Sequence, residues 1–237
     1  ILGFEERGVE IKGNNANDNQ ILNTVITGGS DAAQLAKAAI LVENASGTSI
    51  IGNVLVENNV SAINLRRATN TMVAHNTIAQ NFNGVTFTSN GNWNGFENWR
   101  SLNTCIRNNS ITGHNAGVSQ YYTYTTWDES AQCASVVDNE SAYGNNTFNN
   151  QADCSPSCYE NIPSGVFWEY KADPEFQNTT REGATVPIGY YCLGALNELQ
   201  DAARDLGYDR NGSQQGAFNG SLPDVGGRET GTPTCPE

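Results

Sequence analysis

The segments IIGNVLVENN (residues 50–59), VAHNTIAQNFN (73–83) and IRNNSITGHN (106–115) share one pattern, in which an Asn separates two short apolar runs. Looser copies occur at 21–27 and 136–146. The Asn after the first apolar pair recurs every 23 to 33 residues, at Asn23, Asn53, Asn76, Asn109 and Asn139. Short strand-like runs at this period indicate a solenoid, because a propeller blade needs about 40 to 45 residues.

A second set of alternating runs precedes this Asn in each unit. These runs are GVEIKGNN, AAILVENAS, SAINLRRAT and GVTFTSNGN, starting at Gly8, Ala38, Ser61 and Gly84. We therefore expect an all-β fold, a right-handed parallel β-helix in which each strand pairs with the same strand of the next coil. Residues 1–150 would form the coils with inserted aromatic loops. Residues 151–237 would form a disulfide-rich coil and cap region of the same domain.

The repeated Asn has a structural explanation that needs no function. Carboxamides stacked at the strand spacing of roughly 4.8 Å can donate and accept hydrogen bonds along a column. Because buried amides must be paired, we expect the five aligned Asn residues to form one ladder. Asn139 also begins an N-x-S/T glycosylation sequence, which a place in the ladder would leave unmodified.

The composition excludes some partners. Lys and Arg number 12 against 25 Asp and Glu, which gives a formal net charge of -13. Such a chain repels nucleic acid and anionic lipid surfaces, so we expect no nucleic-acid partner. The longest apolar runs are far too short to span a bilayer, so we expect no membrane span.

Cysteines and glycosylation sequences favour a secreted protein at an extracellular surface. Six cysteines are expected to form three disulfides: Cys105, Cys133, Cys154, Cys158, Cys192 and Cys235. We expect Cys105 to pair with Cys133, and the pairing of the other four stays open. Zinc binding by CSPSC at 154–158 is the rival interpretation, but no second Cys or His pair completes a tetrahedral site. Besides Asn139, the candidate glycosylation sites are Asn44, Asn59, Asn108, Asn145, Asn178, Asn211 and Asn219.

The repeat over residues 8–150 resembles the right-handed β-helix, or pectate-lyase-like, superfamily of secreted proteins. ADPEFQN (172–178), DRNGS (209–213) and DVGGRE (224–229) look like the closing segment of many members, although Gly227 and Arg228 depart from the pattern. The resemblance implies the C-terminal portion of a coil stack. ALNELQDAARDLG (195–207) predicts a short amphipathic helix that caps the open end of the coil.

Two columns hold the candidate catalytic residues. Lys12, Glu43, Arg66 and Thr88 align in the first, and the resemblance implies that a base and flanking cations of this kind could serve a polysaccharide lyase or epimerase. The alternative is an exposed charge ladder with little effect. The second column places His75 with Asn108 and Asp138, where the imidazole could be catalytic or simply a polar surface group.

Two aromatic loops could bind carbohydrate. The loop at 89–103 supplies Trp93, Phe96 and Trp99, and the loop at 119–130 supplies Tyr121, Tyr122, Tyr124 and Trp127. Such rings stack on sugars, but they could equally form a small core or a protein interface. We expect no cofactor and no metal. Calcium at Asp209 and Asn211 is a weaker alternative, because a third ligand and a distal Glu are missing.

The first coil begins almost at residue 1, without a capping helix. Natural solenoids normally cover such an edge, so we expect that upstream coils are absent from this sequence or that another chain packs there. The favoured interpretation is an extracellular glycoprotein module with a structural role, which packs end to end or laterally with other chains. The alternative is a carbohydrate-active enzyme, a lyase or epimerase that acts on an acidic polysaccharide. The sequence offers few catalytic groups for such an enzyme.

Overall fold

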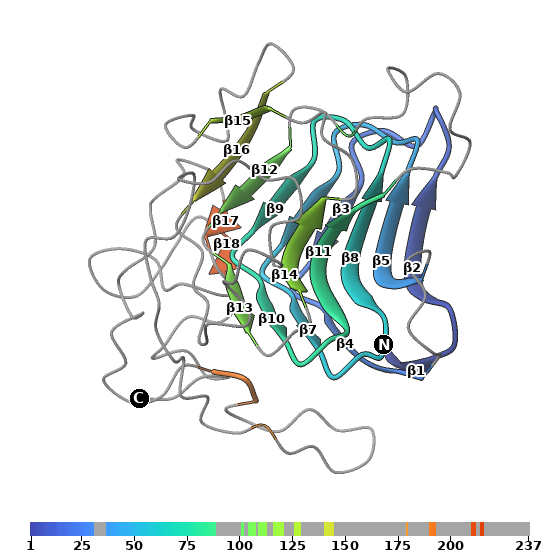
Figure 1. Ribbon diagram of the computed structural model, residues 1–237, viewed down its shortest axis with the longest axis vertical. Coiled ribbons are helices and arrows are strands. Elements are labelled where there is room, and N and C mark those ends of the chain that lie inside the picture. Colours follow the sequence, from blue (N-terminus) through green and yellow to red (C-terminus); the bar gives the residue numbers. More distant parts are fainter. Residues whose placement is uncertain are drawn as a thin grey trace.

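Short parallel strands wind in successive coils around one apolar core in the computed structural model (Figure 1). The structure describes residues 1–30, 37–88, 101, 104–107, 109–112, 116–120, 126–128, 140–144, 179, 190–192, 210–211 and 214–215. Each complete coil gives one strand to each of three parallel sheets. The predicted all-β parallel β-helix is confirmed. The expected capping helix at 195–207 and the division at residue 150 lie outside what these residues test.

The three sheets are built from equivalent strands of successive coils. Sheet 1 contains β1 (Leu2–Phe4), β4 (Val25–Gly29), β7 (Val54–Val56), β10 (Thr77–Ala79) and β13 (Ser110–Thr112). Sheet 2 contains β2 (Arg7–Lys12), β5 (Ala38–Glu43), β8 (Ser61–Arg66), β11 (Asn83–Phe87) and β14 (Ala116–Gln120). Sheet 3 contains β3 (Gln20–Leu22), β6 (Ser49–Ile51), β9 (Met72–Ala74), β12 (Cys105–Arg107), β16 (Glu140–Gly144) and β15 (Thr126–Asp128), in that order.

The far end of sheet 3 departs from chain order. The later strand, β16, pairs with β12, and the earlier strand, β15, pairs with the outer edge of β16. The segment expected as a loop at 119–130 therefore contains the end of β14 and the whole of β15. A separate two-stranded antiparallel hairpin joins β17 (Arg210–Asn211) to β18 (Gln214–Gln215).

Left-handed residues turn the chain at the corners of each coil. A positive φ angle ends an extended run and redirects the backbone, at little steric cost for Gly and about 1–2 kcal/mol for other residues. The strand registers align these residues in four columns: Gly13, Asn44 and Arg67; Asp18, Gly47 and Asn70; Asn23, Gly52 and His75; Gly28, Glu57 and Gln80.

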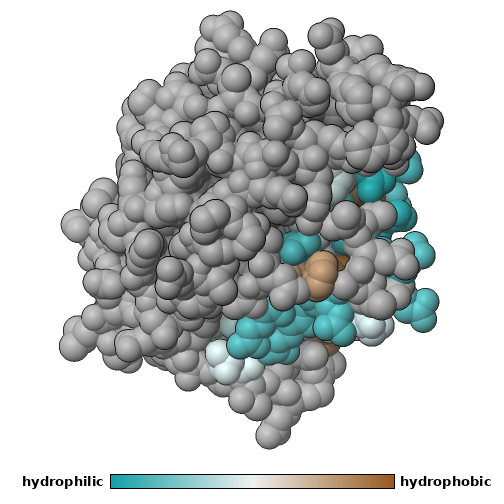
Figure 2. All heavy atoms as spheres, viewed as in Figure 1, coloured by the Kyte–Doolittle hydropathy of each residue, from teal (hydrophilic) through white to brown (hydrophobic). Residues whose placement is uncertain are grey.

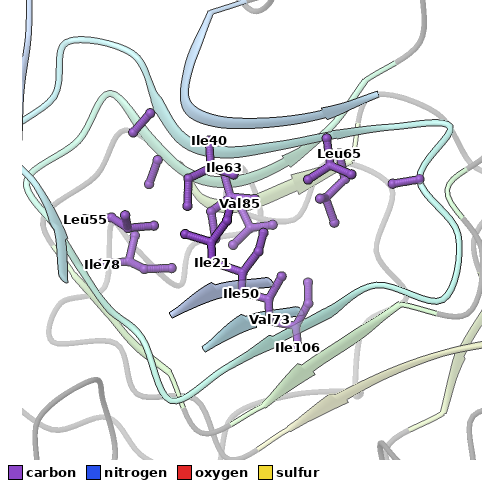
Figure 3. Packing of buried hydrophobic residues seen from close by; sticks show 14 of the residues in the cluster. Ile21, Ile40, Ile50, Leu55, Ile63, Leu65, Val73, Ile78, Val85 and Ile106 are labelled. Carbon is purple, nitrogen blue, oxygen red and sulfur yellow. The ribbon is translucent and has the colours of Figure 1, made fainter. Parts of the chain in front are cut away.

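Aliphatic side chains from the three sheets fill the inside of the coil (Figure 3). The column Ile21, Ile50, Val73 and Ile106 of sheet 3 faces equivalent columns of the other two sheets. Full burial of one such side chain contributes about 1.5–3 kcal/mol, so every added coil stabilises its neighbours. Inside the coil, the core is therefore one continuous cluster.

One Asn ladder closes the corner between sheet 3 and sheet 1. Asn53 Nδ2 donates to Asn76 Oδ1 at 3.0 Å, and Asn76 Nδ2 donates to Asn109 Oδ1 at 2.9 Å. The ladder is confirmed for these three residues, and it is wrong for Asn23. The register places Thr24 over Asn53, and the Thr24 backbone N–H donates to Asn53 Oδ1 at 2.9 Å.

The predicted place of Asn139 in the ladder is not tested, because Asn139 lies outside the described residues. The expectation that its glycosylation sequence is unmodified stays a prediction.

A second ladder, which the sequence analysis missed, lies at the next corner. Asn58 Nδ2 donates to Asn81 Oδ1 at 2.6 Å, and the backbone N–H of Gly29 donates to Asn58 Oδ1 at 3.0 Å. Asn81 Nδ2 in turn donates to the carbonyl of Leu55 at 2.8 Å. The spacing of 23 residues between Asn58 and Asn81 was the available signal, because it repeats the spacing of Asn53 and Asn76.

Candidate functional site

The structure brings the predicted charge column together on the outer side of sheet 2. Lys12 pairs with Glu43, and Glu43 with Arg66, in the strand register. Thr88 follows directly after Phe87, whose partner is Leu65, so it lies beside Arg66. Side chains alternate along a strand, and the neighbours Ile11, Val42 and Leu65 point into the core. We call Lys12, Glu43, Arg66 and Thr88 the charge row.

One carboxylate oxygen joins three coils in the charge row. Glu43 Oε2 lies 3.3 Å from Lys12 Nζ and 3.3 Å from Arg66 NH1. Arg66 Nε donates to Thr88 Oγ1 at 3.4 Å, and Thr88 Oγ1 donates to Asn64 Oδ1 at 2.7 Å. The row therefore continues into a hydrogen-bonded network on the same sheet.

The row is not the exposed ladder that the alternative interpretation assumed. The side chains of Glu43 and Arg66 are 2% and 9% exposed, whereas that of Lys12 is 54% exposed. A buried carboxylate between two cations is a strong structural link, because charges are tolerated in the interior only when paired. It is poorly placed to act on a polymer in solution, so a catalytic role for Lys12 and Arg66 remains an untested prediction.

His75 does not lie on the surface as expected. Its side chain is completely buried, and its φ of 52° makes it a corner residue aligned with Asn23 and Gly52. Asn108 and Asp138, its expected partners, lie outside the described residues. A buried corner imidazole does not fit the predicted role of an exposed catalytic base.

The aromatic candidates for carbohydrate binding are mostly untested. The backbone of Trp127 lies in β15 and pairs with Ser141 at the outer edge of sheet 3. The other candidates lie outside the described residues: Trp93, Trp99, Tyr122 and Tyr124. Carbohydrate binding therefore stays a prediction.

The described cysteines and glycosylation sequences differ in exposure. Cys105 and Cys192 are both buried; Cys133, Cys154, Cys158 and Cys235 lie outside the described residues, so the pairing stays a prediction. Asn59 is exposed in the turn after β7, and Asn44 is half-buried at a corner. The backbone of Asn211 lies in β17. Asn108, Asn145, Asn178 and Asn219 are not among the described residues.

Among the described residues, the first coil forms one end of the stack. Among the described strands, β1, β2 and β3 are the outermost of their sheets, and each pairs with one neighbour (Figure 1). Inward side chains of this coil are partly exposed, namely Phe4, Val9, Ile11 and Ala16, although their equivalents Ile40 and Val42 in the next coil are fully buried. Ile1 is 48% exposed. We call these strands and side chains the open end.

The described part of the face seen in Figure 2 is mostly hydrophilic, with small hydrophobic areas. Among the described residues, no cluster of three or more His, Cys, Asp or Glu side chains could hold a metal ion. Within the same residues, no helix is long and apolar enough to cross a membrane. The calcium alternative at Asp209 and Asn211 is not tested.

A pair of tyrosines covers the outer side of sheet 1, which the sequence analysis did not foresee. Tyr190 and Tyr191 are buried against Val54, Val56 and Ala79, and their rings meet edge to face with centroids 4.9 Å apart. The Tyr191 hydroxyl donates to Glu57 Oε1 at 3.1 Å. Burial raises the pKa of Tyr191, and the charge of Glu57, the neighbouring Tyr190 and this hydrogen bond raise it further.

These features define a parallel β-helix with a buried charge row and an open end. No protein-family model matches the chain, and no curated protein matches it. A crystal structure of pectate lyase Pel9A is similar over 95% of this chain and 69% of that protein, with 13% sequence identity and a TM-score of 0.28. A match this distant carries no argument about activity, and the fold assignment depends on the strand pairing itself.

Proposed function

We propose that this chain is a non-catalytic β-helix module that joins further β-coils at its open end to build a larger assembly. The observation that carries the proposal is the open end itself. Unpaired strand edges are templates for adding another strand, and natural proteins normally cover them. Partly exposed core side chains beside these edges add an apolar driving force.

The arrangement of the candidate catalytic groups supports this proposal over a lyase. A general base must reach the proton that it abstracts, yet Glu43, Arg66 and His75 are all buried. Lys12 is accessible, but its ammonium is paired with Glu43. Lys12, Glu43 and Arg66 instead link three neighbouring coils through their ion pairs.

Assembly can be tested with a charge placed inside the open end. Ile11→Lys puts a cation among the partly exposed core side chains, whereas the control Glu10→Lys puts one on the outer side of the same strand. We expect the native protein to form stacks longer than one chain in electron microscopy and sedimentation velocity. Ile11→Lys should shorten them, and Glu10→Lys should not.

Circular dichroism must show that both variants keep the β-sheet signal of the wild type. Discrete monomers in the native material would contradict the proposal. Equal assembly by Ile11→Lys and the wild type would contradict it as well.

We further propose that the protein is secreted and carries N-linked glycans and disulfides. The even number of cysteines and the exposed position of Asn59 support this proposal. Protein from its natural source should lose mass after treatment with an N-glycosidase, and Asn59 should be among the modified residues. Non-reducing peptide mapping should yield three cystine-linked pairs. Six free thiols or an unmodified chain would contradict secretion by this route.

A further inference from the structure

We propose that the coil that joins the open end carries a carboxylate directly over Lys12. This inference rests on the proposed function and names the chemistry of the partner. The partner strand adds in parallel to β2 with aliphatic side chains over Val9 and Ile11 and an Asp or Glu at the next position. It is recognised by the charge row and not by the Asn ladders.

The sign of charge alternates along the row from coil to coil. Arg66, Glu43 and Lys12 occupy the same register position in β8, β5 and β2. In-register parallel stacking places the next residue of the row directly over Lys12. Like charges directly opposite each other destabilise a sheet and opposite charges stabilise it. The position over Lys12 therefore favours an acidic side chain.

Lys12 has the capacity to bind a second carboxylate. Its ammonium group has three donors, and one acidic partner, Glu43, lies within salt-bridge distance among the described residues. Its side chain is 54% exposed, whereas Glu43 is 2% exposed between two cations. With a carboxylate from an added coil, Lys12 would lie between two carboxylates, just as Glu43 lies between two cations.

The apolar requirement follows from the register between β2 and β5. Ile40 lies over Val9 and Val42 lies over Ile11, and Glu43 then lies over Lys12. The open face of β2 offers the same two apolar side chains and the same cation, with Val9 and Ile11 partly exposed. A strand of the pattern aliphatic, any residue, aliphatic, acid therefore fits this edge, and the sequence AAILVE of β5 is one example.

The Asn ladders do not extend to this partner. The first ladder ends at Thr24 of the first coil, which donates its backbone N–H to Asn53. The second ladder ends at Gly29 of the second coil, which donates its backbone N–H to Asn58 and pairs with Phe4 of the first coil. The Thr24 hydroxyl is directed to the carbonyl of Leu22 in its own coil, at 3.0 Å. None of these three residues has a carboxamide to offer to another coil. Among these rows, the charge row is the one that presents a side-chain group to a new strand.

Two labelled peptides test the inference by fluorescence anisotropy. One contains AAILVE and the other AAILVK, and both have identical Ser-Gly tails for solubility. We expect the wild-type chain to bind the acidic peptide about fivefold more tightly, the effect of a partly exposed ion pair of roughly 1 kcal/mol. Lys12→Glu should reverse the preference. Lys12→Gln, which introduces no repulsion toward Glu43, should abolish it.

Arg7→Glu is the matched control, because it changes the same charge on the same strand outside the row. This variant should keep the preference for AAILVE. Equal binding of both peptides to the wild type would overturn the inference and leave the proposed function intact. Binding of neither peptide would overturn strand addition at β2, and with it the proposed function.

Discussion

Burial decides how much a charged residue contributes to this protein. Glu43 has two cations at the same distance of 3.3 Å, yet their surroundings differ. Arg66 is nearly inaccessible to water, and the ammonium of Lys12 lies at the surface. Solvent screens the second pair, so the two ion pairs should make unequal contributions to folding.

Substitution of each cation by Met separates the two contributions. Arg66→Met leaves a buried carboxylate without its buried partner and should lower the free energy of unfolding by about 3–5 kcal/mol. Lys12→Met should lower it by less than about 1 kcal/mol. Urea denaturation followed by circular dichroism gives both values. Glu43→Gln combined with Arg66→Met should recover part of the loss, and equal effects of the two single variants would contradict this account.

Sequence alignment predicted which residues of the charge row are neighbours, but not their exposure. The spacing of the runs that contain Lys12, Glu43 and Arg66 fixes the register, because coils stack in register. Exposure depends on what else in the chain packs over sheet 2, and coil alignment contains no information about that. The same reason explains why the burial of His75 was missed.

The error at Asn23 has a local cause. Asn23 follows the last residue of β3 and is a left-handed corner residue, in the position that Gly52 and His75 take in the next coils. Asn is suited to both roles, because it tolerates positive φ and has a carboxamide. Matching the letter Asn therefore slipped the alignment by one residue, and Thr24 holds the ladder position.

At the scale of elements, longer strands were predictable and short ones were not. The runs starting at Ala38 and Ser61 correspond to β5 and β8, each of six residues. Strands such as β6 and β7 have three residues each, so the sequence shows them only as two short apolar runs on either side of Asn53, without the bounds of the strands. Three residues are too few to show the alternation that identifies a strand in a sequence.

The corners explain why such short strands are stable. A three-residue strand has few hydrogen bonds of its own, but the ladder amides also bond backbone groups, as Asn76 Nδ2 does with the carbonyls of Ile50 and Ala74 at 2.9 and 3.0 Å. These bonds offset the strain of left-handed residues such as His75, which lies between Ala74 and Asn76. The order of β15 and β16 was not predictable, because a parallel edge accepts either strand.

At the scale of the whole molecule, the coil stack is held by contacts far apart in sequence. Tyr191 hydrogen bonds to Glu57, 134 residues earlier in the chain, and covers the outer side of β7 with Tyr190. No repeat in the sequence encodes this contact, so it could not be predicted. It links the distant segment 190–192 to the third coil through one phenol.

This link predicts a loss of stability at alkaline pH. Burial, the charge of Glu57, the neighbouring Tyr190 and the Glu57 hydrogen bond all raise the pKa of Tyr191 in the folded protein. The folded chain therefore holds the phenol proton more tightly than the unfolded chain. This contribution to stability is fully present below the ordinary tyrosine pKa of about 10 and is lost as pH rises from there toward the folded-state pKa.

Urea unfolding at a series of pH values between about 8 and 11 measures this loss. The free energy of unfolding should fall above about pH 10 by at most about 1.4 kcal/mol per pH unit, the limit for one proton. Tyr191→Phe should make the fall shallower, because the titrating group is gone. Glu57→Gln keeps the phenol but removes a neighbouring charge, so its curve should lie between the other two. Identical curves for the wild type and Tyr191→Phe would show that the phenol does not link the segment to the coil.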